Sequence, residues 1–248
     1  TGKTPPTIIY AWWLIATKRI DCALVICPSN IKYSWAKELT KDLPDYITSF
    51  TNIIEGSKAE KTRLWNESKI FYIANYECVR ADINVVREAF KDKRILLVED
   101  ECHRVKNSDA QQTQAVKSIN RSFTVMLSGT PVANKPQDVF EPIQQVSPNL
   151  LGFSQEHFKK NYAWVDSYDN VSSWRTRGFG ADGNSSALDE IHNRMACISV
   201  RTLRKDANME LGKVIEPQFL DCPEKLAKVY KQATESFILE LSSASDKS

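Results

Sequence analysis

The chain has 248 residues, of which 42% are hydrophobic and 26% charged, and its net charge at neutral pH is +2. This composition is typical of a globular protein with one large or two small domains. The near-neutral charge excludes a purely electrostatic attraction to nucleic acid, so any DNA contact must come from a local basic patch.

Membrane and metal partners find little support in the sequence. No apolar stretch approaches the roughly 18 residues of a membrane span, and no signal peptide is visible. The six cysteines form no C-x-x-C pair and only three histidines are present, which argues against a zinc site. Free thiols fit a reducing compartment, either the cytoplasm of a bacterium or its phage or a eukaryotic nucleus.

Residues 1–148 alternate between helical and strand patterns. Predicted helices cover residues 4–18, 30–39, 76–90, 109–119 and 136–146, and predicted strands cover residues 22–27, 70–74, 95–98 and 123–127. Strands that alternate with helices predict an α/β fold with a central parallel sheet flanked by helices. In such folds the active groups gather at the carboxyl ends of the strands.

The pattern changes after residue 148. Helices are predicted at residues 153–162 and 188–196, with a Gly/Ser/Asn/Asp-rich loop or mobile insertion at 166–186. A strand at 214–220, a charged helix at 223–241 and a frayed tail at 242–248 follow. We therefore expect an α/β lobe at 1–148, a helical protrusion at 149–213, and a return strand and helix at 214–248.

The most informative motif is Asp100-Glu101-Cys102-His103, directly after the apolar run at 95–98. Nucleotide-hydrolysing α/β folds place Mg²⁺ and water beside a phosphate with carboxylates at such a strand end. We expect Asp100 to hold Mg²⁺ through water and Glu101 to orient or deprotonate the attacking water. The alternative is a solvated acidic strand end. Against it, Glu99, Asp100 and Glu101 are adjoining like charges that repel unless a cation or partner compensates.

His103 has two interpretations in this motif. It is either an ordinary surface histidine or a hydrogen-bonded link between the nucleotide site and the next motif, Ser128-Gly129-Thr130-Pro131. Ser128, Gly129 and Thr130 could sense the γ-phosphate and couple its state to the rest of the protein. Taken alone, that second motif favours an ordinary Gly-Pro loop.

The chain opens with Thr1-Gly2-Lys3-Thr4, which matches the end of an ATP-binding P-loop. Backbone N–H groups at a helix start hold phosphate oxygens, Lys3 would reach the β- and γ-phosphates, and the Thr4 hydroxyl would bind Mg²⁺. The upstream glycine of a full P-loop is not in the chain. Taken alone, the match could therefore be a chance Gly-Lys-Thr at a ragged end.

Two further strand ends carry candidate DNA contacts. Pro28-Ser29-Asn30 follows the strand at 22–27, and Asn75-Tyr76 follows the strand at 70–74. Their amides and side chains could meet a phosphodiester backbone, with Lys32 adding charge and Trp35 packing. The alternative for each is loop and helix-cap chemistry, for which Asn30 is an ordinary candidate. Trp12 and Trp13, on an apolar helix, are expected in the core rather than against bases.

The sequence does not decide whether the basic residues after residue 148 contact DNA. They are Lys159, Lys160, Arg175 and Arg177 near the insertion, and Arg201, Arg204 and Lys205 after it. The insertion could contact DNA, although a solvated loop is favoured. The later group could contact DNA or brace two lobes against each other.

Together, in this order, the motifs resemble the first RecA-like motor lobe of superfamily-two helicases, and most closely the SWI/SNF-type branch of double-stranded DNA translocases. Residues 100–107 are similar to the branch's D-E-x-H-x-x-K-N signature, and residues 127–134 to its L-[ST]-G-T-P-x-x-N motif. Residues 23–28 with Trp35 and Glu38, residues 73–77 and residues 200–206 add to the likeness. The Asn134-Lys135-Pro136 segment is closer to compact annealing-helicase-like and phage members than to large chromatin remodelers.

The resemblance implies a P-loop NTPase lobe that binds ATP and Mg²⁺ and couples hydrolysis to movement on duplex DNA, with single-stranded or branched DNA as possible substrates. It also implies a second lobe in the same chain that carries an arginine finger. Removing such a finger costs roughly 10³–10⁵ in rate, so residues 1–248 alone are expected to hydrolyse ATP poorly.

Three other functions stay open. A strand-separating helicase or restriction-type motor subunit would use the same fold. A non-catalytic scaffold that binds DNA or protein would not need intact Lys3, Thr4, Asp100 and Glu101. A P-loop kinase or transferase would not need the T-P-x-x-N loop.

Overall fold

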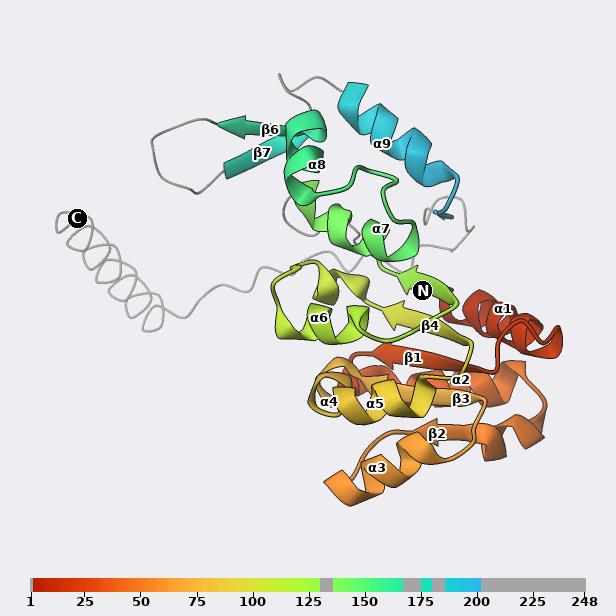
Figure 1. Ribbon diagram of the computed structural model, residues 1–248. Helices are drawn as coiled ribbons and strands as arrows, with labels where there is room; N and C mark the ends of the chain where they lie inside the picture. The colour runs from red at the N-terminus through yellow and green to blue at the C-terminus, as the bar shows by residue number, and fades with distance from the viewer. Residues whose placement is uncertain (1, 130–135, 167–174, 180–185, 202–248) are drawn as a thin grey trace, which may run out of the picture. The chain divides into compact units, whose positions relative to one another are not determined.

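The computed structural model describes residues 2–129, 136–166, 175–179 and 186–201, and the account below is confined to them (Figure 1). The strand expected at 214–220, the helix at 223–241 and the tail at 242–248 lie outside this part of the chain. So do Thr1, Thr130, Arg204 and Lys205.

A five-stranded parallel sheet in the order β2-β3-β1-β4-β5 forms the centre of the fold. Its strands are β1 (Cys22–Cys27), β2 (Thr51–Ile53), β3 (Phe71–Asn75), β4 (Ile95–Asp100) and β5 (Phe123–Leu127). The register places Cys27 opposite Asn75 and Asp100 opposite Leu127, so these strands end at the same edge. The prediction of a parallel α/β sheet is thereby confirmed.

Helices cover both faces of the sheet (Figure 1). One face carries α3 (Lys58–Asn66), α4 (Tyr76–Ala81), α5 (Ile83–Phe90), α6 (Gln111–Lys117) and the 3₁₀ turn η3 (Cys102–Val105). The other carries α1 (Thr4–Ala16), α2 (Lys32–Asp42) and η2 (Asp45–Phe50), while η1 (Ser29–Ile31) precedes α2. Side chains of β1 and β4 alternate between the two layers, and because both layers are apolar, both strands are buried throughout.

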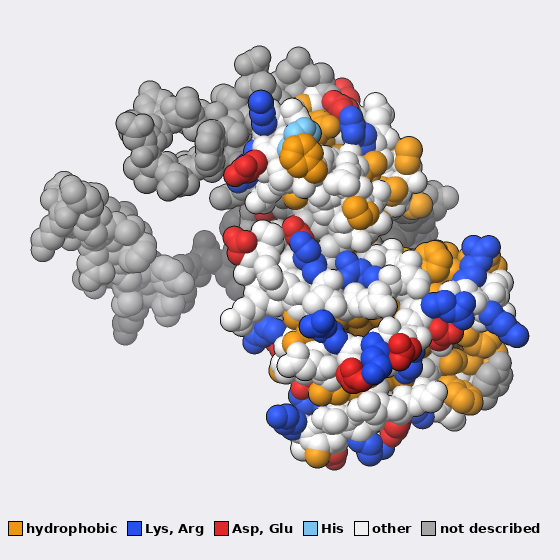
Figure 2. Space-filling model, in the orientation of Figure 1, with side chains coloured by type: hydrophobic (Ala, Val, Ile, Leu, Met, Phe, Trp, Pro, Cys, Tyr) orange, Lys and Arg blue, Asp and Glu red, His pale blue; other side chains and the backbone are white. Residues whose placement is uncertain are grey.

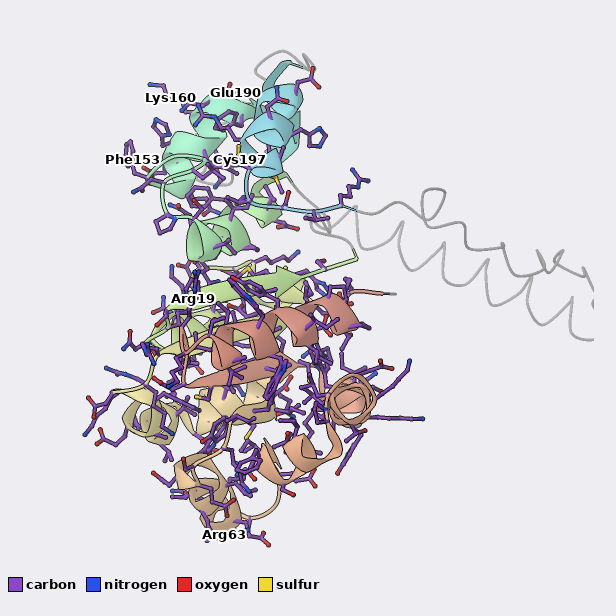
Figure 3. All side chains as sticks on the ribbon, turned by 90° about the vertical axis from the view of Figure 1, so that its right-hand side faces the viewer. Arg19, Arg63, Phe153, Lys160, Glu190 and Cys197 are labelled. Atoms are coloured by element: carbon purple, nitrogen blue, oxygen red, sulfur yellow. The ribbon has the colours of Figure 1, made fainter. Side chains whose placement is uncertain are left out.

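The chain after β5 builds a separate apolar cluster. Its residues come from η4 (Pro136–Val139), α7 (Phe140–Val146), α8 (Gln155–Tyr162) and α9 (Ser186–Ala196), with Leu151 from the loop before α8. This part of the chain also forms the antiparallel pair β6 (Ala163–Asp166) and β7 (Arg175–Phe179). Phe140, Phe158 and Ile191 are buried together in this cluster. Figure 3 shows Phe153, Lys160 and Glu190 around α8 and α9. The domain boundaries expected at residues 148 and 213 stay a prediction.

Several local expectations were wrong. The expected helix at 76–90 is two helices, because the chain turns at Asp82, whose carboxylate accepts hydrogen bonds from Trp65 and Cys78 and pairs with Lys61. Strand β2 and helix α3 were not predicted. Strand β7 lies within the expected loop at 166–186.

Trp13 was expected in the core, and that expectation was wrong. Helix α1 buries Ile8, Ala11 and Leu14 against the sheet, which turns Trp13 outward with 46% of its surface exposed. There the ring stacks on Tyr10 and lies beneath the guanidinium of Arg19, 4.9 Å from the ring centre.

Candidate functional site

The side chains that the sequence singled out gather at the carboxyl edge of the sheet. Asn75 ends β3, Asp100 ends β4, and Ser128 directly follows β5. The start of α1 reaches the same edge, because the Lys3 ammonium lies 3.5 Å from the Glu101 carboxylate. Thr130 lies outside the described residues.

The start of α1 is built to leave backbone N–H groups open. Gly2 has a φ of 69°, a conformation that favours glycine, and Lys3 occupies the N-cap position without a side-chain cap. The first turn of an α-helix has N–H groups without partners inside the helix, and they attract anions. Because Pro5 and Pro6 carry no N–H, Lys3 and Thr4 supply the donors of this turn.

Glu101 sits between two cationic or titratable neighbours. One carboxylate oxygen faces Lys3, and the other lies 3.3 Å from Nδ1 of His103, a contact that lacks hydrogen-bond geometry. The backbone of Glu101 is left-handed, with a φ of 54°. Non-glycine residues rarely adopt this conformation, and it persists where surrounding contacts hold it. The turn leaves the carboxylate partly exposed at the sheet edge.

Asp100 is held from three directions. Its Oδ2 accepts a hydrogen bond from the indole Nε1–H of Trp35 at 2.9 Å, and its Oδ1 accepts one from the backbone N–H of Glu101 at 2.9 Å. The backbone carbonyl of Asp100 accepts a hydrogen bond from the Tyr76 hydroxyl at 2.8 Å. The carboxylate is 6% exposed, so its orientation is fixed by these bonds.

The residues at this edge fit Mg²⁺ rather than a metal held entirely by protein. Asp100 and Thr4 offer hard oxygen ligands, which suit Mg²⁺ that keeps waters and binds substrate phosphates. Across the described ranges, no group of three or more His, Cys, Asp or Glu side chains could hold a metal ion. When bound, Mg²⁺ would neutralise charge on the phosphates.

Glu99 does not add a third charge to this cluster. It points to the opposite face of β4, is fully buried, and neither of its carboxyl oxygens has a hydrogen-bond partner. Burial raises the pKa of Glu99 from 4.5 to about 8; Arg121 opposes the rise and Glu141 adds to it. The expected repulsion among Glu99, Asp100 and Glu101 is therefore relieved by separation and protonation, and needs no cation.

The two candidate DNA loops are tied to each other. The Asn75 amide donates to the Ser29 hydroxyl, while its Oδ1 accepts the Cys78 N–H and caps α4. Ser29 and Asn30 are exposed, and Pro28 is half-buried. On the face shown in Figure 2, basic and acidic side chains are interspersed rather than gathered into one patch.

Two of the residues assigned to DNA face inward. The Lys32 ammonium lies 3.4 Å from the Ile54 carbonyl and 3.3 Å from the Glu55 carboxylate. Tyr76 is 0% exposed, backbone included, so in this conformation no part of it is accessible to a phosphodiester. As DNA contacts, both stay predictions, and for Lys32 that role requires the ammonium to leave Glu55.

Sequence reasoning missed the links between these motifs. Arg104 pairs with Glu77 at 3.0 Å, and Lys106 pairs with Asp138 at 2.7 Å. Trp35 was expected to add packing beside the DNA loops and to carry part of the family likeness, but its indole donates a hydrogen bond to Asp100. No local pattern reveals these partners, because 27 to 65 residues separate them.

An uncapped helix start beside an acidic strand end, at the carboxyl edge of a parallel sheet, is the arrangement expected of a RecA-like ATPase lobe. The model of the SNF2-related domain family matches residues 1–248, and the chain belongs to this family. It is therefore an ATPase-type domain of helicase superfamily two, as the motifs predicted. No helix in the described ranges is long and apolar enough to cross a membrane.

Relatives and solved structures agree with this assignment. The chain is 33% identical over 179 residues to the DNA repair protein rhp54 of Schizosaccharomyces pombe, covering 65% of this chain and 20% of rhp54. It is 25% identical over 241 residues to the DNA annealing helicase and endonuclease ZRANB3 of Bos taurus, covering 95% of this chain and 21% of that protein. The chain thus spans about a fifth of these relatives.

The fold is similar to the Sulfolobus solfataricus SWI2/SNF2 ATPase core domain, with a TM-score of 0.61 and 22% identity over 84% of this chain and 38% of that one. The same core in complex with dsDNA gives a TM-score of 0.55 and 23% identity over 65% of this chain and 32% of that one. These likenesses confirm the predicted RecA-like lobe.

Replacing Glu99 with Gln should remove a pH dependence of stability. Because the folded-state pKa is raised from 4.5 to about 8, the stabilising proton is fully bound below pH 4.5 and is lost as pH rises through about 8. The wild-type melting temperature should therefore fall across this window, and that of Glu99→Gln should fall less. Thermal unfolding at several pH values measures this, with the exposed Glu156→Gln as control. Equal slopes for wild type and Glu99→Gln would contradict the account.

Proposed function

We propose that this chain is the first motor lobe of an ATP-dependent DNA translocase, which couples ATP hydrolysis to movement on duplex DNA. The observation that carries the proposal is the approach of Lys3 to Glu101 at 3.5 Å, beside the fixed carboxylate of Asp100. The phosphate-binding lysine and the water-orienting carboxylate thereby face each other at one sheet edge.

In the proposed mechanism Lys3 exchanges Glu101 for β- and γ-phosphate oxygens of ATP. That exchange frees the Glu101 carboxylate to accept a hydrogen bond from the attacking water. Asp100 and the Thr4 hydroxyl would hold Mg²⁺, which when bound would neutralise phosphate charge, and the N–H groups of Lys3 and Thr4 would bind phosphate oxygens. His103, next to Glu101, together with Ser128, Gly129 and Thr130, relays the state of the γ-phosphate.

Duplex DNA is the proposed partner of the loops at Pro28-Ser29-Asn30 and Asn75-Tyr76. Three observations support this: the two loops are bonded to each other, they lie at the edge that carries Asp100, and Ser29 and Asn30 are exposed. The Sulfolobus core of similar fold was solved with dsDNA, and rhp54 is a DNA repair protein. The second lobe, with its arginine finger, completes the motor.

The substitution Glu101→Gln should abolish ATP hydrolysis that duplex DNA stimulates. Loss of a general base costs roughly 10²–10⁴ in rate, while nucleotide binding should persist. The longest natural chain containing these residues is assayed with no DNA, single-stranded DNA and duplex DNA, with Glu156→Gln as control. A preference for single strands would favour a strand-separating helicase. Binding of nucleotide without turnover in the wild type would favour a scaffold.

Residues 1–248 alone should hydrolyse ATP about 10³–10⁵ times more slowly than the longer chain, because the arginine finger of the second lobe is absent. Comparison of both proteins at saturating ATP and duplex DNA measures this ratio. Equal turnover by the two would show that this lobe needs no finger from elsewhere.

Placing a negative charge on the Ser29 loop should weaken the response to DNA. A carboxylate within a few ångströms of a phosphate costs about 1 kcal/mol even in water, so Ser29→Glu should raise the duplex concentration for half-maximal stimulation at least about fivefold. Turnover without DNA should not change. Ser34→Glu, exposed on α2, is the control for charge, and Ser29→Ala is the control for loss of the Asn75 bond. Equal effects of the two Glu variants would show that this loop is not part of the DNA interface.

A further inference from the structure

Two helices that begin at the two candidate DNA loops each donate a hydrogen bond to Asp100. Trp35 belongs to α2, which follows η1 (Ser29–Ile31), and its indole N–H donates to Oδ2 of Asp100 at 2.9 Å. Tyr76 is the first residue of α4, directly after Asn75, and its hydroxyl donates to the Asp100 carbonyl at 2.8 Å.

These bonds form part of a closed ring. The chain connects Ser29 to Trp35 through η1 and the start of α2, and Trp35 is hydrogen-bonded to Asp100. Asn75 precedes Tyr76, which is also hydrogen-bonded to Asp100. The hydrogen bond between Asn75 and Ser29 closes the ring at the loops. Because the 2%-exposed Trp35 and the fully buried Tyr76 are packed without room to adjust, a shift of either loop must move a donor relative to Asp100.

The two donors control different parts of the site. The Trp35 bond and the Glu101 N–H engage opposite carboxylate oxygens, and together they fix the plane of the carboxylate. The Tyr76 bond orients the peptide that joins Asp100 to the left-handed Glu101. Partners that orient a metal ligand from outside typically change metal affinity or activity 10–100-fold when removed.

We propose that Trp35 and Tyr76 are positioning residues that couple the two DNA loops to Mg²⁺ binding at Asp100, so that duplex DNA tightens the Mg²⁺–nucleotide site. The inference rests on the proposed function, because it assigns DNA to these loops and Mg²⁺ to Asp100. Binding linkage requires the reverse effect as well: nucleotide with Mg²⁺ must tighten DNA binding by the same factor.

The chain supplies matched controls against a merely structural role. Trp65 is also fully buried, and its indole N–H donates to a carboxylate, that of Asp82, at 3.2 Å. Tyr72 is also fully buried, and its hydroxyl donates to a backbone carbonyl, that of Glu67. Neither contacts Asp100. Trp→Phe and Tyr→Phe at these positions therefore remove the same kind of bond from the core while leaving the site intact.

The experiment compares Trp35→Phe with Trp65→Phe, and Tyr76→Phe with Tyr72→Phe, in the longest natural chain containing these residues. Mn²⁺ replaces Mg²⁺, and free Mn²⁺ is measured by electron paramagnetic resonance with a non-hydrolysable ATP analogue, with and without duplex DNA. Trp35→Phe should raise the Mn²⁺ dissociation constant about tenfold and, like Tyr76→Phe, should lose most of the tightening by DNA. The Trp65 and Tyr72 variants should keep wild-type values, and thermal unfolding reports the stability of each.

Two results would overturn the inference. One is a Mn²⁺ affinity of Trp35→Phe equal to that of Trp65→Phe, and the other is a wild-type Mn²⁺ affinity that duplex DNA does not change. If wild-type hydrolysis is nevertheless stimulated by duplex DNA, the proposed function stands and only the coupling route fails. If Mn²⁺ binding behaves as expected but wild-type hydrolysis does not respond to DNA, translocation fails and the positioning role stands.

Discussion

The alternation of side chains along β4 is the constraint on which the site depends. Successive residues of a strand point to opposite faces, so Glu99 enters the layer under α6 while Asp100 enters the layer that contains Trp35. A shift of one residue in register would exchange the two carboxyls and put a neutral acid at the position proposed for Mg²⁺ binding. Pairing of β4 with both β1 and β5 fixes the register and hence which acid faces the nucleotide edge.

The same sheet edge brings the proposed nucleotide-binding residues and the proposed DNA loops close enough to share hydrogen bonds. Parallel strands end at the same edge, so strand pairing alone places the loops after β1 and β3 near the acidic end of β4. The result is a short physical path from an exposed hydroxyl at Ser29 to a buried carboxylate at Asp100. Such a path suits the proposed function, because a translocase must respond to DNA while nucleotide is bound.

The sequence predicted those elements that carry a strong signal of their own. Strand β1 is a continuous apolar run and was placed correctly, while β4, predicted from its apolar run at 95–98, extends to Asp100. Strand β2 has only three residues, and α3 has a mostly polar sequence, so the sequence pattern of neither element differs from that of a loop. On α1 almost every position is apolar, so periodicity could not tell that Trp13 faces outward. The inward turn of Lys32 depends on Glu55, 23 residues away, which no local pattern encodes.

The proline pair at the start of α1 affects how the proposed ATP site would form. A pyrrolidine ring holds φ near about −65°, close to the helical value, so Pro5 and Pro6 restrict the helix start before any ligand arrives. Part of the conformational entropy of ordering the first turn is then lost during folding rather than on nucleotide binding. A nucleotide bound as proposed would therefore meet a preorganised helix start with few N–H donors. Its affinity would come more from the rigidity of this turn than from the number of hydrogen bonds.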